Sequence, residues 1–172
     1  MNNLLEFSVL PVLLLIVLLV VLVSLLIMTI KPNRLHYKKQ NALFTKAEIN
    51  FLKTLEKIVT NPNVAIFGKV RIADIITPQK TTNSKGWWQL FAKITSKHVD
   101  YVLCNRNDYS VICVIELNDK SHNTTQAKQR DSFVRKAYQS AGIELVEIKA
   151  SRYYDANKVI MQFSKEVRIK IV

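Results

Sequence analysis

Two acidic residues stand inside apolar segments of the chain, where a carboxylate needs a partner. Asp100 lies in SKHVDYVLC and Glu116 lies in VICVIELND, and both segments have the apolar, β-branched composition of strands. Residues 105–110 between them are typical of a hairpin turn. Because the start of one hairpin strand lies beside the end of the other, we expect the two carboxylates side by side.

Two carboxylates that meet on a buried sheet repel each other, and each loses solvation. A positive group between them restores the balance, and the sequence leaves two kinds open: a divalent cation with oxygen ligands, or a lysine or arginine. In the second case the basic partners are Lys97 and Lys120, and the carboxylates form only structural ion pairs.

The elements that position this pair follow the order helix, strands, hairpin, helix, strand, helix. Thr45 and Glu48 have the spacing of a capping box that opens the first helix, and that role alone accounts for Glu48. The other expected elements are one or two strands at 64–76 bent near Gly68, an aromatic segment at 87–94, strands at 98–104 and 111–117, a helix at 125–141 capped by Gly142, a strand at 143–148 and a closing helix at 155–167. The order predicts an α/β (α+β) fold with a mixed sheet flanked by helices.

Positive charge is concentrated in one part of the chain. The 172 residues carry a formal net charge of +12, and every lysine and arginine follows residue 30. Such an excess attracts polyanions, of which nucleic acid and anionic lipid headgroups are the usual candidates. A solvated basic surface without a ligand accounts for the same composition. Cys104 and Cys113 lie in strand segments and are expected to be reduced and packed as small hydrophobes.

The N-terminal segment is apolar throughout. Residues 8–30 contain no charged side chain and are long enough for a helix to cross a bilayer. We expect an uncleaved single-pass anchor, because the preceding residues lack the basic start of a signal peptide, the main alternative. Basic residues directly after it place the N-terminus outside and the C-terminal domain in the cytoplasm: Lys31, Arg34, Lys38 and Lys39. The expected organisation is a transmembrane anchor at 1–30, a basic juxtamembrane linker at 31–43 and an α/β domain at 44–172.

Four segments resemble the pattern of a bacterial family known as domain of unknown function two-seven-two-six: KHVDYVLC, IELNDKSH, QRDSF and AGIEL. That family resembles a branch of the PD-(D/E)xK, or restriction-endonuclease-like, superfamily, and its layout is similar to that of the very-short-patch-repair nucleases. The resemblance covers residues 44–148 and is most specific over residues 97–131. It implies a restriction-endonuclease-like mixed sheet for the domain.

The resemblance also implies a metal site. Asp100 and Glu116 would bind Mg²⁺ or Mn²⁺, with the Leu117 carbonyl as a further ligand and Glu48 acting through water. His122 matches a histidine that helps to activate water in the repair-nuclease-like branch. The metal would activate a water molecule and neutralise the charge that builds on a phosphodiester.

One position departs from the superfamily pattern, because Asn118 stands where E-x-K has its lysine. An amide supplies neither a positive charge nor a titratable base. Either Lys120, Lys97 or His122 takes over this role in space, or catalysis is lost. Lys97 and Arg130 are the candidate contacts to nucleic acid, with Arg130 either holding a phosphate or simply solvated.

These residues favour a membrane-tethered, Mg²⁺-dependent nuclease that acts on DNA or RNA. Two alternatives stay open: a catalytically inactive nucleic-acid-binding module at the membrane, and a basic scaffold protein that lies on anionic lipid. The lipid bilayer and DNA or RNA are thus the expected partners, and the sequence sets no oligomeric state.

Overall fold

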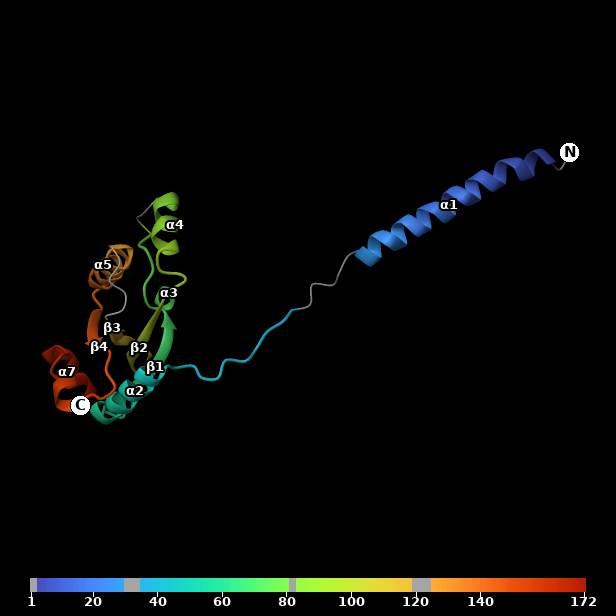
Figure 1. Ribbon diagram of the computed structural model, residues 1–172. Coiled ribbons are helices and arrows are strands. Elements are labelled where there is room, and N and C mark those ends of the chain that lie inside the picture. Colours follow the sequence, from blue (N-terminus) through green and yellow to red (C-terminus); the bar gives the residue numbers. More distant parts are fainter. Residues whose placement is uncertain (1–2, 30–34, 81–82, 119–124) are drawn as a thin grey trace. The chain divides into compact units, whose positions relative to one another are not determined.

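The computed structural model describes residues 3–29, 35–80, 83–118 and 125–172, and the chain forms two compact units, Met1–Asn41 and Ala42–Val172 (Figure 1). The first unit contains α1 (Asn3–Thr29). Within α1, Val9–Met28 is the one stretch among the described residues that is long and apolar enough to cross a membrane. A signal sequence near the N-terminus passes the same test of length and composition. The expected apolar helix is therefore confirmed.

The second unit is built on a mixed sheet of four strands in the order β1-β2-β3-β4. The strands are β1 (Val64–Arg71), β2 (His98–Asn105), β3 (Val111–Asn118) and β4 (Glu144–Lys149). Neighbouring strands are antiparallel except β3 and β4, which are parallel because α5 (Thr125–Ser140) connects them. The predicted α/β class with a mixed sheet is confirmed.

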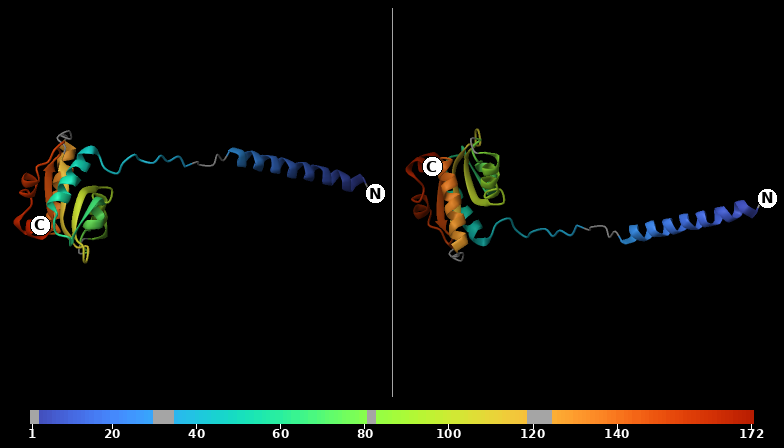
Figure 2. Two further views of the ribbon diagram at one scale, coloured as in Figure 1. Left: turned by 90° about the horizontal axis from the view of Figure 1, so that it is seen from below. Right: turned by 90° about the horizontal axis from the view of Figure 1, so that it is seen from above.

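Helices cover both faces of the sheet (Figures 1 and 2). On one face, Phe51 and Leu55 of α2 (Lys46–Ile58) form a core with α6 (Ala156–Ile160) and α7 (Lys165–Ile171). On the other face, α3 (Ile72–Ile75), α4 (Ser84–Ala92) and α5 pack over a second core that includes Val102 and Val114. Alternate residues of the central strands thus enter different cores, which explains why both hairpin strands are apolar on both faces.

Two helix ends agree with the sequence. The capping box at the start of α2 is present, since Thr45 accepts from the Glu48 amide and the Glu48 carboxylate accepts from the Thr45 amide. After α5, Gly142 has φ +70°, the left-handed conformation that glycine adopts most easily at a helix C-terminus.

Three segments differ from the prediction. Residues 72–75 form α3 rather than the end of a strand, because Ile72, Ile75 and Ile76 have helical spacing and pack on one core. The aromatic segment forms α4, which begins at the Asn83 cap. The closing helix is interrupted between α6 and α7, where Ser164 caps the second helix.

Candidate functional site

The hairpin of β2 and β3 brings the two predicted carboxylates to the same place. Its ladder runs from Cys104–Val111 to Tyr101–Ile115, and the next pair in this register is Asp100 with Glu116. The ladder between these strands stops there. Beyond this point β2 stays paired with β1 as far as His98, and β3 stays paired with β4 as far as Asn118. The sheet therefore divides into two arms at Asp100 and Glu116, a position we term the fork.

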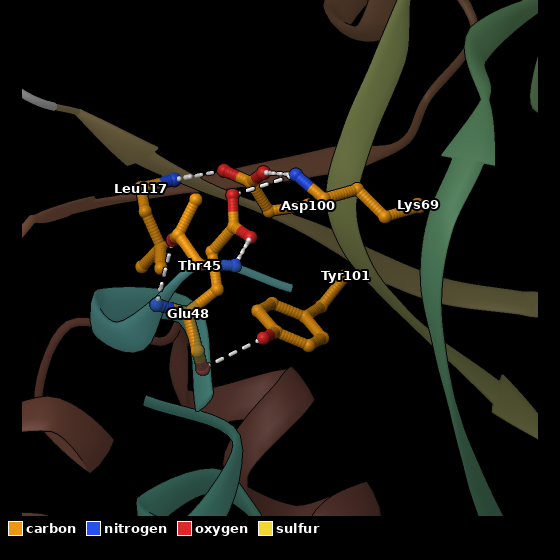
Figure 3. A network of polar contacts seen from close by, with 6 residues as sticks. All are labelled: Thr45, Glu48, Lys69, Asp100, Tyr101 and Leu117. Carbon is orange, nitrogen blue, oxygen red and sulfur yellow. Dashed lines mark hydrogen bonds and ion pairs between the residues drawn. The ribbon is translucent and has the colours of Figure 1, made fainter. Parts of the chain in front are cut away.

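The Asp100 carboxylate occupies the fork (Figure 3). The backbone N–H of Leu117 donates to its Oδ2 at 2.8 Å, and the ammonium of Lys69 donates to its Oδ1 at 3.1 Å. A side chain on β2 thus replaces backbone pairing with β3 at this point. It is the amide of Leu117 that contacts Asp100.

Lys69 is a site residue that the sequence did not reveal. Its ammonium also donates to Oε1 of Glu48 at 2.6 Å, so it bridges two carboxylates whose side chains are only 13% and 14% exposed. Lys69 has φ +57°, a left-handed conformation that non-glycine residues seldom adopt. Pairing between β1 and β2 accordingly omits Lys69 and Asp100 and resumes at the next residues. Among the described residues, Asp100 pairs with Lys69, a lysine that the sequence did not suggest as its partner.

Glu48 has two roles at once. Its Oε2 accepts from the Thr45 backbone at 2.7 Å as part of the capping box, while its Oε1 accepts from Lys69 (Figure 3). The Tyr101 hydroxyl donates to the Glu48 carbonyl at 2.8 Å and fixes this turn of α2 against the sheet. Partial burial opposes ionisation, but the hydrogen bonds from Lys69 and Thr45 outweigh it and lower the pKa of Glu48. Capping alone therefore does not account for this residue.

Among the described residues, Glu116 is the one carboxyl whose pKa is clearly raised. Burial, and then the negative charge of Asp100, raise its pKa from 4.5 to about 7. A hydrogen bond from the Asp100 backbone and the charge of Lys69 offset only part of this effect. The neighbouring Tyr138 hydroxyl is buried and has no hydrogen-bond partner among the described residues. Burial and the Glu116 charge raise the pKa of Tyr138, so its hydroxyl remains a donor.

These side chains line one cavity of about 660 Å³, here termed the acidic cavity. Five carboxylates line it: Glu48, Asp100, Glu116, Asp131 and Glu147. Its cationic side chains are Lys97 and Arg135. Arg135 is held by Glu147 through two nitrogens, at 2.6 and 3.0 Å. Asn118, at the position of the missing lysine, donates to Glu147 Oε1 at 3.1 Å, and these bonds lower the pKa of Glu147.

Five predicted site residues line the acidic cavity: Glu48, Lys97, Asp100, Glu116 and Leu117. Lys120 and His122 lie outside the described residues, and Arg130 lies in α5 with its side chain outside them. Within the described part of the chain, no three His, Cys, Asp or Glu side chains are grouped to hold a metal ion. Mg²⁺ is commonly bound by one or two carboxylates and several waters, so a group of three such side chains is not required for it.

Comparison with known proteins places this α/β unit in a family. Residues 40–167 match the family described as protein of unknown function (DUF2726), and the chain belongs to that family, as predicted. An uncharacterized protein of Haemophilus influenzae is 30% identical over 111 residues, which cover 64% of this chain and 55% of that protein. The chain therefore spans about half the length of the curated relative it matches. No solved structure matches the chain.

Proposed function

We propose that the unit Ala42–Val172 is a restriction-endonuclease-like nuclease that hydrolyses nucleic acid with Mg²⁺ or Mn²⁺ held by Asp100 and Glu116. The observation that carries this proposal is the unbalanced charge of Glu116, which lies buried beside a second carboxylate with a pKa raised to about 7. A divalent cation with oxygen ligands would balance the charge that Lys69, the one described cation bonded to Asp100, leaves on this pair. The resemblance of the hairpin segments to PD-(D/E)xK nucleases supports the same reaction.

The charge of the acidic cavity supports a cation-dependent reaction. Five carboxylates and two cationic side chains line it, so a phosphodiester is repelled unless further positive charge is bound. When bound, the cation would activate water and neutralise the charge that develops on the phosphate. Arg135 presents a guanidinium oriented by Glu147, and Lys69 orients the Asp100 carboxylate. Lys69 also supplies the positive charge that Asn118 cannot.

The test is a cleavage assay on the full chain in non-ionic detergent, with labelled DNA and RNA and either Mg²⁺ or Mn²⁺. The informative variants are Glu116→Gln and Asp100→Asn, because Asn keeps an oxygen that can accept from the Leu117 amide. Glu56→Gln, on the exposed side of α2, is the matched control. We expect metal-dependent cleavage that is lost in both site variants and kept in the control. Cleavage that survives both site substitutions contradicts the proposal.

A catalytically inactive nucleic-acid-binding module is the second candidate. It is favoured by Lys69, which already forms ion pairs with Glu48 and Asp100, and by Asn118, which is bonded to Glu147. This candidate predicts oligonucleotide binding that weakens steeply with salt, needs no divalent cation and is unchanged in Glu116→Gln. Cleavage by the wild-type chain excludes it.

We also propose that α1 is an uncleaved membrane anchor with the C-terminal unit in the cytoplasm. The support is the apolar stretch Val9–Met28 and the basic residues that follow residue 30 with none before it. A reporter fused after Val172 should be active only in its cytoplasmic form. Lysines inserted ahead of Ser8 should reverse that result, and a reporter that is exported from the unmodified chain contradicts the assignment.

A further inference from the structure

A second cavity adjoins the acidic cavity. The two share Ala47 and Ala150 in their walls, and the remaining lining comes from the first turns of α2 and the loop after β4. Those remaining residues are Lys46, Asn50, Ser151, Arg152 and Tyr153. We term it the basic cavity. A ligand that occupies one cavity therefore reaches the entrance of the other.

The loop that forms the basic cavity is fixed to α2. The side-chain amide of Asn50 donates to the backbone carbonyl of Arg152 at 3.0 Å. The Tyr154 ring packs edge-on against Phe51, with ring centroids 5.1 Å apart. The side chains of Arg152 and Tyr153 are left exposed. The backbone that carries these two side chains is thus held against α2.

The two cavities carry opposite charge. Five carboxylates line the acidic cavity, whereas the basic cavity is lined by Lys46 and Arg152 and by no acidic side chain among the described residues. A polyanion that places one phosphate at a cation in the acidic cavity would therefore find its neighbouring phosphate stabilised in the basic cavity. This alternation matches an extended phosphodiester chain better than a single small anion.

Tyr153 adds an aromatic surface to this charge. The side chain is 89% exposed, and its ring makes no aromatic contact within the described residues. Exposed aromatic rings beside basic residues bind single-stranded nucleic acid by stacking on its bases. In a duplex both faces of a base are covered by its neighbours, so a ring of this kind selects unpaired nucleotides.

We propose, resting on the nuclease function above, that the basic cavity binds a single-stranded segment next to the phosphodiester that is cleaved. Lys46 and Arg152 contact its phosphates, and Tyr153 stacks on one unpaired base. The substrate class is then DNA or RNA that carries unpaired nucleotides at the cleavage site, such as a single strand, a flap or an overhang.

Binding without catalysis tests this proposal. The full chain carrying Glu116→Gln, in non-ionic detergent with EDTA, is titrated into a labelled single-stranded oligonucleotide and into the corresponding duplex, with fluorescence anisotropy as the readout. We expect the single strand to bind more tightly, and Tyr153→Ala to weaken its binding about tenfold. Tyr37→Ala is the matched control, because Tyr37 is equally exposed, at 89%, and lies outside the α/β unit.

Salt dependence separates phosphate contacts from stacking. Removing two phosphate contacts by Lys46→Ala with Arg152→Ala should reduce the slope of log K against log salt by about 1.4, from about 0.7 per contact on a single strand. Lys57→Ala with Lys165→Ala removes the same charge from exposed positions that line neither cavity and should leave the slope nearly unchanged.

Three results overturn the proposal: equal binding of duplex and single strand, equal effects of Tyr153→Ala and Tyr37→Ala, or equal slopes for the two double variants. If the double variant Lys46→Ala with Arg152→Ala loses binding to nanodiscs that contain anionic lipid but still binds the oligonucleotide, the basic cavity binds lipid headgroups instead. Because this binding assay needs neither a divalent cation nor catalysis, a negative result in the separate cleavage assay would contradict only the nuclease proposal.

Discussion

Replacing Glu116 by glutamine should stabilise the α/β unit at alkaline pH, which is the opposite of what removing a structural ion pair does. The folded-state pKa of Glu116 is raised from 4.5 to about 7 by burial and by Asp100. Between these values the folded state holds a proton that the unfolded state has released. Stability therefore falls as pH rises through this window, and Glu116 adds no further pH dependence below it or above it.

The size of the effect follows from the displacement of the pKa. From 4.5 to about 7, at about 1.4 kcal/mol per pH unit, the ionised Glu116 destabilises the fold by about 3 kcal/mol. Glutamine keeps the shape of the protonated acid and never ionises. The free energy of unfolding of Glu116→Gln should therefore exceed that of wild type by about 3 kcal/mol near pH 8.5 and by less than about 1 kcal/mol near pH 4.5.

Urea unfolding followed by tryptophan fluorescence measures this difference in the full chain. Both tryptophans, Trp87 and Trp88, lie in α4, so the signal comes from the α/β unit rather than from α1. The contributions of the other titrating groups to the free energy of unfolding cancel when the variant is compared with wild type at each pH. Near pH 8.5, Mg²⁺ at a hundredfold excess over its Kd should raise the free energy of unfolding of wild type by about 2.7 kcal/mol. It should leave the free energy of unfolding of Glu116→Gln nearly unchanged.

Glu147→Gln is the matched control within the same cavity. The Arg135 guanidinium lowers the pKa of Glu147, so this residue contributes stability above the unfolded pKa of 4.5 that is lost as pH falls through its folded value. Its substitution should therefore destabilise the unit near pH 8.5. If Glu116→Gln destabilises the unit there in the same way, Glu116 has a partner that balances its charge and the reasoning is refuted.

Three further substitutions test the surroundings of the site by the same unfolding measurement. Tyr138→Phe removes a buried hydroxyl without a partner among the described residues and should raise the free energy of unfolding by about 1 kcal/mol, whereas a loss would show that the hydroxyl is bonded. Lys69→Met leaves two largely buried carboxylates without the ammonium between them and should lower the free energy of unfolding by about 2 kcal/mol at pH 7, whereas Lys69→Arg should retain most of it. Gly68→Ala places a Cβ 2.3 Å from Cζ of Phe44 and should disrupt its stacking, a loss of about 1 kcal/mol that disappears in a Phe44→Ala background.

The sequence was sufficient for the hairpin and therefore for the meeting of the two carboxylates. The apolar, β-branched composition of the two segments identified β2 and β3, and their register brings Asp100 opposite Glu116. Local signals were also sufficient for the capping box at Thr45 and the C-terminal glycine of α5, because both depend on adjacent backbone alone. Each of these features involves residues close in sequence.

Lys69 could not be found in this way, because its role depends on strand order and on an unusual backbone conformation. The pairing of β1 with β2 brings Lys69 beside Asp100, which is 31 residues away in the sequence. Lys69 has a left-handed backbone, with φ +57°, at the point where the pairing of β1 with β2 omits Lys69 and Asp100. The short helices α3 and α4 were missed for a different reason. Apolar runs of this length fit a strand or a helix equally well, and the cores of the fold decide between them.

The division of the sheet at the fork has a mechanical consequence. The paired part, from Tyr101–Ile115 to Cys104–Val111, includes residues with no exposed surface, whereas beyond it each ribbon carries its own helix, α3 against β1 and α5 against β4. Twisting these two ribbons apart about the paired part would break no hydrogen bond of either ladder, but it would strain the bond from the Leu117 amide to Asp100. We expect the distance between the β1–β2 ribbon and the β3–β4 ribbon to vary in solution, while the paired part of β2 and β3, the root, stays intact. Backbone amides at the root should then exchange with solvent far more slowly than those at the tips.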